Sequence, residues 1–365
     1  MGKTTTKIII VLAVAFVAIA VFQARHQGGN NPDEVRPQQL FPQLDLALVA
    51  AVQLEHAGAS LTLRRGEGDS WGVEQRAGYP VDGEKLRRLA LGIAQLQSRD
   101  RLTANPEQYA TLGLADPPEG GTVTLQGADG NALAVLRLGQ HKQPKSPGGA
   151  SGQFVRVDDD PAVYLVANAP AADTGPTTWV DRKLLDLAAD QVIGVAVTRP
   201  KGSFVASRQQ PTDPLTLETP LPKGRSANSS ALGDLGRALV NLTCDDVLAT
   251  DTPATAALTF DVAFAAESAA GVRYTIALAE KDDQHYARLE AEAGAAKPET
   301  GEASTTAKPG EAPGDGAPAA SKADPEATAT AFNQRHHGWT YTLPQYTYQR
   351  LAKNLDDVLA PTEKQ

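Results

Sequence analysis

Residue types that carry chemistry are present in this 365-residue chain, but their spacing matches no catalytic motif. No glycine-rich fingerprint opens a helix after a strand, and no phosphate-binding loop of the Walker type occurs. Serines that stand beside glycine or another serine lack the strand–turn–helix context of a nucleophile elbow. The sequence therefore predicts no catalytic residue set and no cofactor.

Histidines and clustered acids are the candidate metal ligands. Of the six histidines only His336 and His337 are adjacent, and neighbours in a strand point to opposite faces, so this pair is a poor chelate unless the backbone bulges. The run Asp158–Asp160 lacks the spaced oxygens and final glutamate of a calcium loop, and it suits a hairpin turn. We expect no metal site.

The single cysteine, Cys244, follows an apolar helical stripe and is interpreted as a small buried hydrophobe. One cysteine excludes an intramolecular disulfide and with it a disulfide-stapled secreted scaffold. Trp71, Trp179 and Trp339 lie in or beside predicted elements, so core packing is their expected role. The net charge of −9 comes without a basic stripe, which argues against nucleic-acid binding.

The elements that would position these residues begin near Leu44. Apolar alternation and glycine–aspartate turns predict consecutive strands and two hairpins, and Asp82 is expected to cap a helix. Together they define a first unit over residues 44–188. Its expected strands are 49–56, 60–65, 70–75, 122–126, 132–138, 153–157 and 162–167, and its expected helices are 82–97 and 179–187.

The same order of elements returns in residues 189–365. Leu232, Leu235, Leu239 and Leu242 lie 146 positions beyond Leu86, Leu89, Ile93 and Leu96, on the helix of the second unit. Strands precede and follow that helix as they do in the first unit, and a last helix is expected over 344–359. This repetition predicts a tandem duplication.

The second unit contains an insertion, residues 291–329, rich in alanine, proline, glycine and acids and without any larger aliphatic residue. Such a segment buries too little apolar surface to offset the entropy of ordering, so it is expected to be disordered. Elsewhere, consecutive strands joined by hairpins with one amphipathic helix per unit predict an α+β class. Each antiparallel sheet would be covered on one face by helix.

An apolar run of 15 residues, 8–22, follows Lys3 and Lys7. A membrane span needs about 20 residues and a signal-peptide core about 7–15, so both interpretations stay open, with an uncleaved transmembrane helix favoured. The charge bias predicts a cytoplasmic N-terminus and an outward body. Residues 1–24 are the expected anchor or signal peptide and 25–43 a flexible tether. The expected anchor residues are Ile8, Val11, Leu12, Phe16, Ile19 and Phe22.

Several ordered motifs in the first unit carry a resemblance. They are Trp71–Val73, Tyr79–Asp82, Asn105–Tyr109 through Gly113–Pro117, Phe154–Arg156, Pro161–Val166 and Trp179–Leu185. In this order, after an apolar N-terminal run, the chain resembles the bacterial family called domain of unknown function 4340. The motif residues Trp71, Pro80, Asp82, Tyr109, Gly113 and Trp179 are interpreted as determinants of the fold, and no catalytic residue is carried over.

The resemblance implies single-anchor envelope proteins associated with uncharacterised ABC-type systems related to gliding-motility auxiliaries. We therefore expect a non-enzymatic, membrane-tethered periplasmic accessory or binding module. Its expected partners are the membrane and an ABC-type permease and ATPase, and its expected localisation is the bacterial inner membrane, single-pass. Two alternatives stay open: an envelope hydrolase, and a structural envelope protein that self-associates.

Overall fold

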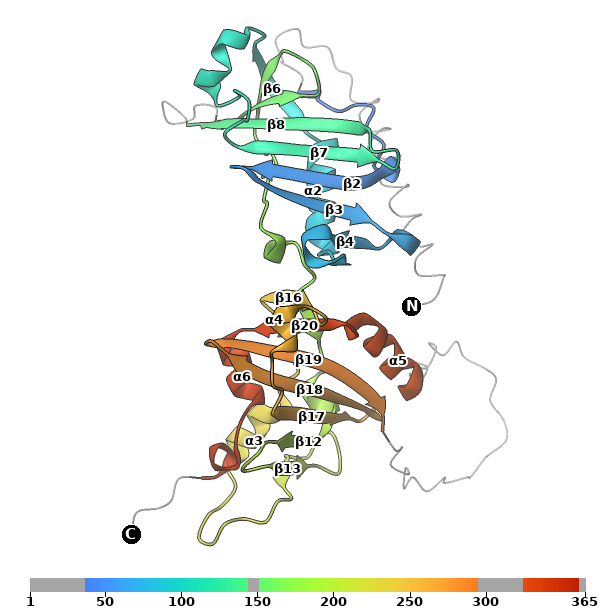
Figure 1. The fold of residues 1–365 in the computed structure, drawn as a ribbon, viewed down its shortest axis with the longest axis vertical. Coiled ribbons are helices and arrows are strands. Elements are labelled where there is room, and N and C mark those ends of the chain that lie inside the picture. The colour runs from blue at the N-terminus through green and yellow to red at the C-terminus, as the bar shows by residue number, and fades with distance from the viewer. Residues whose placement is uncertain (1–36, 144–150, 295–323, 361–365) are drawn as a thin grey trace, which may run out of the picture.

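The computed structural model describes residues 37–143, 151–294 and 324–360. Two antiparallel sheets lie one above the other along the long axis of the molecule (Figure 1). The first sheet contains β1 (Gln38–Gln39), β2 (Val49–His56), β3 (Ala59–Arg65), β4 (Trp71–Val73), β5 (Tyr79–Pro80), β6 (Gln97–Thr103), β7 (Gly121–Gly127), β8 (Ala132–Lys142), β9 (Gly152–Val157) and β10 (Val163–Val166).

The second sheet contains eight strands, and a short two-stranded ribbon lies between the units. The ribbon is formed by β11 (Lys183–Leu185) and β15 (Leu242–Thr243). The strands of the second sheet are β12 (Val192–Thr198), β13 (Phe204–Ser207), β14 (Thr216–Leu217), β16 (Asp246–Ala249), β17 (Val262–Ser268), β18 (Val272–Lys281), β19 (Gln284–Ala293) and β20 (Trp339–Leu343).

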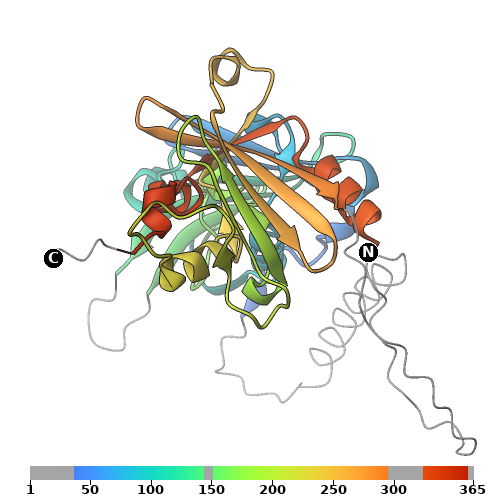
Figure 2. The same ribbon diagram turned by 90° about the horizontal axis from the view of Figure 1, so that it is seen from below.

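Among the described residues helices are few and mostly short. They are α2 (Gly83–Ala94), α3 (Ser229–Gly236), α4 (Pro253–Ala256), α5 (Pro325–His336) and α6 (Gln345–Leu351), together with short 3₁₀ turns that include η3 (Glu74–Arg76) and η8 (Leu355–Val358). Helix α2 buries Leu86, Leu89 and Ile93 against the first sheet, and α3 buries Leu232 and Leu235 against the second. Viewed from below, the helices of the second unit surround its twisted sheet (Figure 2).

The two sheets have the same strand order. In the first sheet eight strands follow one another as β4-β3-β2-β7-β8-β9-β10-β6, and in the second the order is β14-β13-β12-β17-β18-β19-β20-β16. Eight of the ten strands of the first sheet, all except β1 and β5, therefore have a counterpart at the same place in the second. A shared order of eight strands is the arrangement that a tandem duplication produces.

Details at the helix starts repeat as well. Asp82 accepts hydrogen bonds from the second and third residues after it, Glu84 and Lys85, and Asn228 does the same at the start of α3. Next to each cap lies an isolated antiparallel bridge, Val81 with Val180 in the first unit and Ala227 with Leu359 in the second. In each unit the residue just before the helix cap therefore pairs with a residue near the end of the same unit.

The linker between the units, Trp179–Leu185, holds them together. The backbone N–H of Asp82 donates to Trp179 O (2.7 Å), and that of Asp181 donates to Pro80 O (2.8 Å), so this segment adds to the edge of the first sheet. A few residues later β11 pairs with β15 of the second unit. The linker is therefore hydrogen-bonded to both units.

The predicted α+β class is wrong, because the described residues form a fold dominated by antiparallel sheet with few helices. The expected helix over 179–187 is instead a turn followed by β11, whose partner β15 lies far away in the sequence. The expected helix over 344–359 divides into α6 and η8. Periodicity overestimated helix because short apolar runs fit both elements.

Both ends of the expected disordered insertion lie in regular structure. Strand β19 continues to Ala293, and α5 begins at Pro325 with Asp324 as its N-cap. The central part of the insertion, 295–323, lies outside the described residues. The low apolar content of the ends is compensated by sheet pairing with β18 and by the packing of Ala329 and Phe332.

In the described part of the chain no helix is both long enough and apolar enough to span a membrane. This finding corrects the predicted transmembrane helix and single-pass inner-membrane localisation. The expected anchor residues, from Ile8 to Phe22, lie outside the described residues.

Candidate functional site

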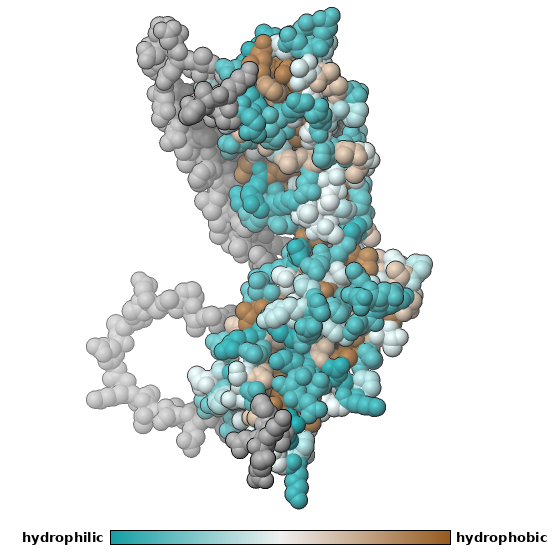
Figure 3. All heavy atoms as spheres, turned by 90° about the vertical axis from the view of Figure 1, so that its left-hand side faces the viewer, coloured by the Kyte–Doolittle hydropathy of each residue, from teal (hydrophilic) through white to brown (hydrophobic). Residues whose placement is uncertain are grey.

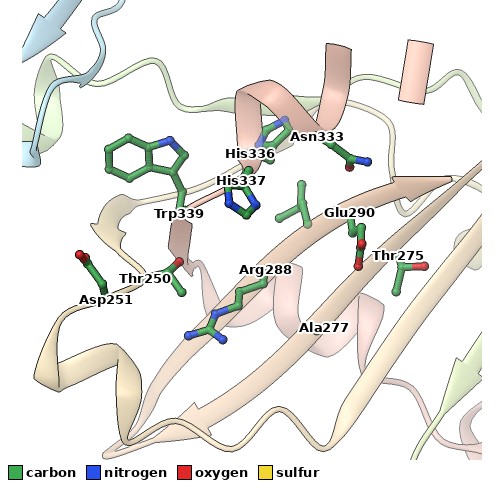
Figure 4. A pocket seen from close by; sticks show the side chains of 12 residues that line it. Thr250, Asp251, Thr275, Ala277, Arg288, Glu290, Asn333, His336, His337 and Trp339 are labelled. Carbon is green, nitrogen blue, oxygen red and sulfur yellow. The ribbon is translucent and has the colours of Figure 1, made fainter. Parts of the chain in front are cut away.

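A hollow lies in the second unit, where β19 and β20 separate beside the end of α5. We call it the α5 hollow; its volume is about 780 Å³, within the usual range of ligand pockets. Figure 4 shows its lining, which comes from β18, β19, the end of α5, the start of β20 and the turn after β16. The lining residues are Thr250, Asp251, Thr275, Ala277, Arg288, Leu289, Glu290, Asn333, His336, His337, Gly338 and Trp339.

A change of partner along β19 creates this hollow. Pairing with β20 stops at Ala287, opposite Tyr341. Further along, the side-chain amide of Asn333 takes the place of a strand: its Oδ1 accepts from Ala291 N and its Nδ2 donates to Ala291 O, both at 2.7 Å. In an antiparallel strand every second residue directs its backbone N–H and C=O to the same side. Ala287 directs these groups to β20 and Ala291 directs them to Asn333. The backbone groups of Leu289, which lies between the two, therefore point into the hollow.

Arg288 is held firmly at the floor of the hollow. Its Nε donates to Thr340 Oγ1 (3.1 Å), its Nη2 donates to Thr255 O (3.3 Å), and its guanidinium carbon lies 4.4 Å from the ring centre of Phe260. In the first unit Arg156 has the same strand position and lies 4.2 Å from the ring centre of Tyr109. The arginine–aromatic pair thus repeats in both units, and its primary role is to fix the fold.

The wall behind the α5 hollow is aromatic. His336 is 2 % exposed, and its Nδ1 lies 2.8 Å from the hydroxyl of Tyr341. Burial, with a smaller contribution from Arg335, lowers the pKa of His336 to about 4. Tyr79 of the first unit packs edge-on against Trp339 and Tyr341 with ring centres 5.1 and 6.0 Å apart. The hollow therefore adjoins the contact between the units.

A second hollow of about 620 Å³ lies in the first unit. We call it the β8 hollow, because glycine, glutamine and histidine of β8 form its floor. His56 Nε2 lies 3.2 Å from Glu119 O, Gln140 donates to Glu119 Oε1 (3.0 Å), and the buried Gln153 donates to Gly139 O (3.0 Å). Its lining residues are His56, Glu119, Gly120, Gly139, Gln140, His141, Gln153, Ala169, Ala171, Ala172 and Asp173.

The candidate ligands and nucleophile from the sequence are dispersed. His56 and His141 line the β8 hollow, His285 stacks on Tyr348, and His336 and His337 lie at the α5 hollow. Across residues 37–143, 151–294 and 324–360, no group of three or more histidine, cysteine, aspartate or glutamate side chains is placed to hold a metal ion.

The acidic run and the cysteine have structural surroundings. Asp158 accepts from Val135 N (2.8 Å), and Asp160 accepts from Ala162 N (2.8 Å) and from the hydroxyl of Tyr164 (2.6 Å), so these carboxylates stabilise the hairpin turn. Cys244 is fully buried, and burial raises the pKa of its thiol to about 12. A neutral, buried thiol is a poor nucleophile.

Three of the motif residues lie at the start of α2. Trp71 is in β4, where its carbonyl accepts from Val81 N (2.9 Å). Pro80 is in β5, and its carbonyl receives the N–H of Asp181 from the linker. Asp82 caps α2. Trp71, Pro80 and Asp82 thus lie along one short path that leads from the sheet edge into the helix.

The other three motif residues are spread through the first unit. The Tyr109 hydroxyl donates to Pro161 O (2.6 Å), and Gly113 ends a 3₁₀ turn with φ of 70°. Trp179 is 2 % exposed; its Nε1 donates to Asp173 O (2.7 Å), and Lys85 Nζ lies 4.2 Å from its ring centre. Of these three the structure brings only Trp179 close to the Asp82 cap, and none of the six motif residues lines the α5 hollow.

Sequence reasoning missed the residues that form the α5 hollow apart from the histidine pair and Trp339. One signal was available: Gln153–Val157 and His285–Leu289 have the same pattern, with arginine at the fourth place of each. This pattern aligns the strands, but it gives no sign that β20 pairs with β19 only from Tyr341 to Leu343 and not at Trp339 and Thr340. Asn333 was assigned to no element, although its amide completes the edge of β19.

The fold and the hollows define a duplicated antiparallel β protein with an open strand edge in its second unit. The family described as "Domain of unknown function (DUF4340)" matches residues 71–260, just over half of the chain. The chain therefore belongs to this family. The matched segment runs from β4 to the residues just before β17 and so covers parts of both units. No curated protein and no solved structure matches the chain.

Proposed function

We propose that this protein is a non-enzymatic binding module that accepts a short extended segment of a partner protein in the α5 hollow. The observation that carries the proposal is the open edge of β19 at Leu289, between the last pair with β20 and the amide of Asn333. An exposed strand edge offers backbone donors and acceptors to an extended peptide, and neighbouring side chains supply the specificity.

The side chains around this edge suit binding better than catalysis. Arg288 already has three partners, and Glu290, Asp251 and His337 are exposed at the rim. Within the described lining no hydroxyl or thiol is hydrogen-bonded to a histidine or carboxylate as a nucleophile would be to its base. A mixed-charge rim around a strand edge is typical of protein recognition.

We further propose that the partner belongs to an ABC-type transport complex, to which this protein is an accessory. The resemblance of the motifs around Trp71 and Trp179 to the domain of unknown function 4340 family supports this part. The partner would be the permease or the ATPase. The α5 hollow supplies the place of contact, and the resemblance supplies the class of partner.

Photo-crosslinking in the host cell tests the proposal. We would introduce p-benzoylphenylalanine at Thr275, which lines the α5 hollow, and separately at Val205, an exposed residue of β13 outside it. Mass spectrometry should identify peptides of an ABC-type permease or ATPase crosslinked to Thr275 and not to Val205. Equal crosslinking at both positions, or none at Thr275, would contradict the proposed binding hollow.

The alternatives receive less support. An envelope hydrolase would join a histidine to a carboxylate in one cleft. Each hollow is lined by two histidines and two acids, but among the described residues none of these histidines is hydrogen-bonded to a carboxylate. A self-associating structural protein would favour a large apolar patch. Figure 3 shows small, separate apolar areas on a largely hydrophilic face. The exposed large apolar side chains also lie on separate segments: Leu48, Leu102, Val205, Leu221, Val240 and Tyr346.

A further inference from the structure

The duplication allows the two units to be compared position by position. Val155 pairs with Tyr164 and with Leu138, and the counterparts are Ala287 with Tyr341 and Leu278. Counting along β9 and β19 from these pairs matches Gln153 with His285. Strand β8 has a bulge between Leu138 and His141, so the residue paired with Gln153 is His141, which therefore matches Glu280, the partner of His285. The same counting from β2 and β12 matches His56 with Arg199.

In the second unit these positions surround a tyrosine. The ring of Tyr348, on α6, stacks on His285 with ring centres 4.3 Å apart and planes 10° apart. Burial, followed by the charge of Glu280, raises the pKa of the Tyr348 phenol, and Arg199 acts in the opposite direction. Three matched positions therefore form the surroundings of one phenol ring.

In the first unit the same positions surround empty space. His56, His141 and Gln153 all line the β8 hollow. Tyr348 is the fifth residue after Leu343, the end of β20, and the fifth residue after Val166, the end of β10, is Ala171. Ala171 and its neighbours Ala169 and Ala172 are too small to fill the place of α6, and they line the hollow as well.

We propose that the β8 hollow binds the phenol ring of a tyrosine side chain presented by a partner protein. The ring would lie on the Gln153 amide, as Tyr348 lies on His285. The carboxylate of Glu119, held by Gln140, lies in the lining and accepts the phenol O–H. Its counterpart in this respect is Glu280 beside Tyr348.

This inference goes beyond the proposed function and stands without it, because it concerns the other unit and different residues. A failure of the crosslinks at Thr275 would leave it unaffected. Conversely, a β8 hollow that binds no phenol would leave the strand edge at Leu289 available to a partner.

Titration of the ¹⁵N-labelled full chain with N-acetyl-tyrosinamide tests the inference directly. Amide signals of Gly139, Gln140 and Gln153 should shift in a saturable way at millimolar concentrations. N-acetyl-phenylalaninamide, which lacks the phenol hydroxyl, should bind about fivefold more weakly, as expected for one lost hydrogen bond. The absence of saturable shifts at these residues would overturn the proposal.

Substitution Ala171→Tyr supplies the ring from the chain itself. Ala171 is exposed and lines the hollow, so the variant should fold. It should reproduce the shifts at Gln140 and Gln153 without ligand and lose the response to N-acetyl-tyrosinamide. Ala128→Tyr, in the exposed turn between β7 and β8, adds the same ring elsewhere and should leave the titration unchanged. An unchanged titration of Ala171→Tyr would contradict the proposed site.

Substitution Tyr348→Ala makes the opposite change. Removal of the ring should open a matching hollow in the second unit, so N-acetyl-tyrosinamide should then shift the amides of Glu280 and His285 as well. The number of ligand molecules bound should rise from one to two. A folded Tyr348→Ala protein that shows no response at His285 would refute the equivalence on which the proposal rests.

Discussion

Gly113 joins local geometry to the β8 hollow. It ends the 3₁₀ turn Ala110–Leu112 with φ of 70°, and a Cβ placed there would lie 2.8 Å from Gln140 N. Gln140 in turn holds Glu119 at the hollow. Gly113 therefore fixes both a turn and the lining of a candidate site. Its importance at the scale of a residue follows from backbone sterics alone.

Gly113→Ala should therefore destabilise the protein in two ways. The left-handed backbone costs about 1 kcal/mol for alanine, and the clash with backbone adds about 1–3 kcal/mol. Gly58→Ala is the matched control, because φ is 80° there and nothing lies within 4 Å of the added Cβ. Urea unfolding should show a clearly larger loss for Gly113→Ala; equal losses would contradict the role given to the clash.

His336 should make stability depend on pH. Its pKa is lowered from 6.5 to about 4 in the folded protein, chiefly by burial. The unfolded chain therefore binds more protons between these values, so stability is present above the unfolded pKa and falls as pH falls toward 4. From about pH 7 to about pH 5 this group should cost about 2 kcal/mol.

The measurement is urea unfolding of the wild type and of His336→Asn at both pH values. The variant keeps a polar atom near the hydroxyl of Tyr341 but does not titrate. Between about pH 7 and about pH 5 the variant should lose about 2 kcal/mol less stability than the wild type. The same pH dependence in both proteins would show that His336 does not carry it.

At the scale of elements, side chains complete pairings that strands leave open. The amide of Asn333 takes the place of a strand beside Ala291, which joins α5 to β19. Asp82 and Asn228 do the same for the first turns of α2 and α3. The α5 hollow exists because the Asn333 side chain pairs with only one residue of β19, Ala291.

Asn333→Asp should weaken the contact between α5 and β19. Aspartate keeps the acceptor for Ala291 N but loses the donor to Ala291 O, which should cost about 2 kcal/mol. Asn228→Asp is the matched control, since aspartate caps a helix as well as asparagine does and should change stability by less than about 0.5 kcal/mol. Thermal unfolding should separate the two variants; equal melting temperatures would contradict this account of the edge.

At the scale of the whole molecule, the two units meet edge to edge. Arg76 of η3 forms two hydrogen bonds with Asp246 of β16, at 2.6 and 2.7 Å, and both side chains are about four-fifths buried at 22 % and 21 % exposure. Tyr79 packs on Trp339 and Tyr341 beside this pair. Together with the linker, these contacts join the two units.

A double-mutant cycle with Arg76→Met and Asp246→Asn should give a coupling energy of about 1–3 kcal/mol, because the pair is bidentate and shielded from solvent. The exposed pair Arg64 with Glu74, which lies within the first unit, should give at most about 1 kcal/mol. Calorimetry of Arg76→Met should also show the two units unfolding less cooperatively. Equal coupling in the two cycles would contradict a specific contact between the units.

Much of the fold could be predicted from local patterns. Alternation set the strand 49–56 as observed, and the predicted helix over 82–97 corresponds to α2 with Asp82 as its cap. The leucine spacing 146 positions apart indicated the duplication, whose strand order the two sheets share. These features depend on neighbours in the sequence, because burial of one face imposes a period on the residues of that face.

The hollows were decided by tertiary structure alone. Leu289 is an apolar strand residue in the sequence, and only the divergence of β20 and the arrival of Asn333 leave its backbone open. Ala171 is one alanine among many until the fold places it with Gln153 in the lining of one hollow. The sequence by itself determined which residues are buried and which turn the chain. Tertiary packing of distant segments determined which edges stay open, because an edge is defined by its missing neighbour.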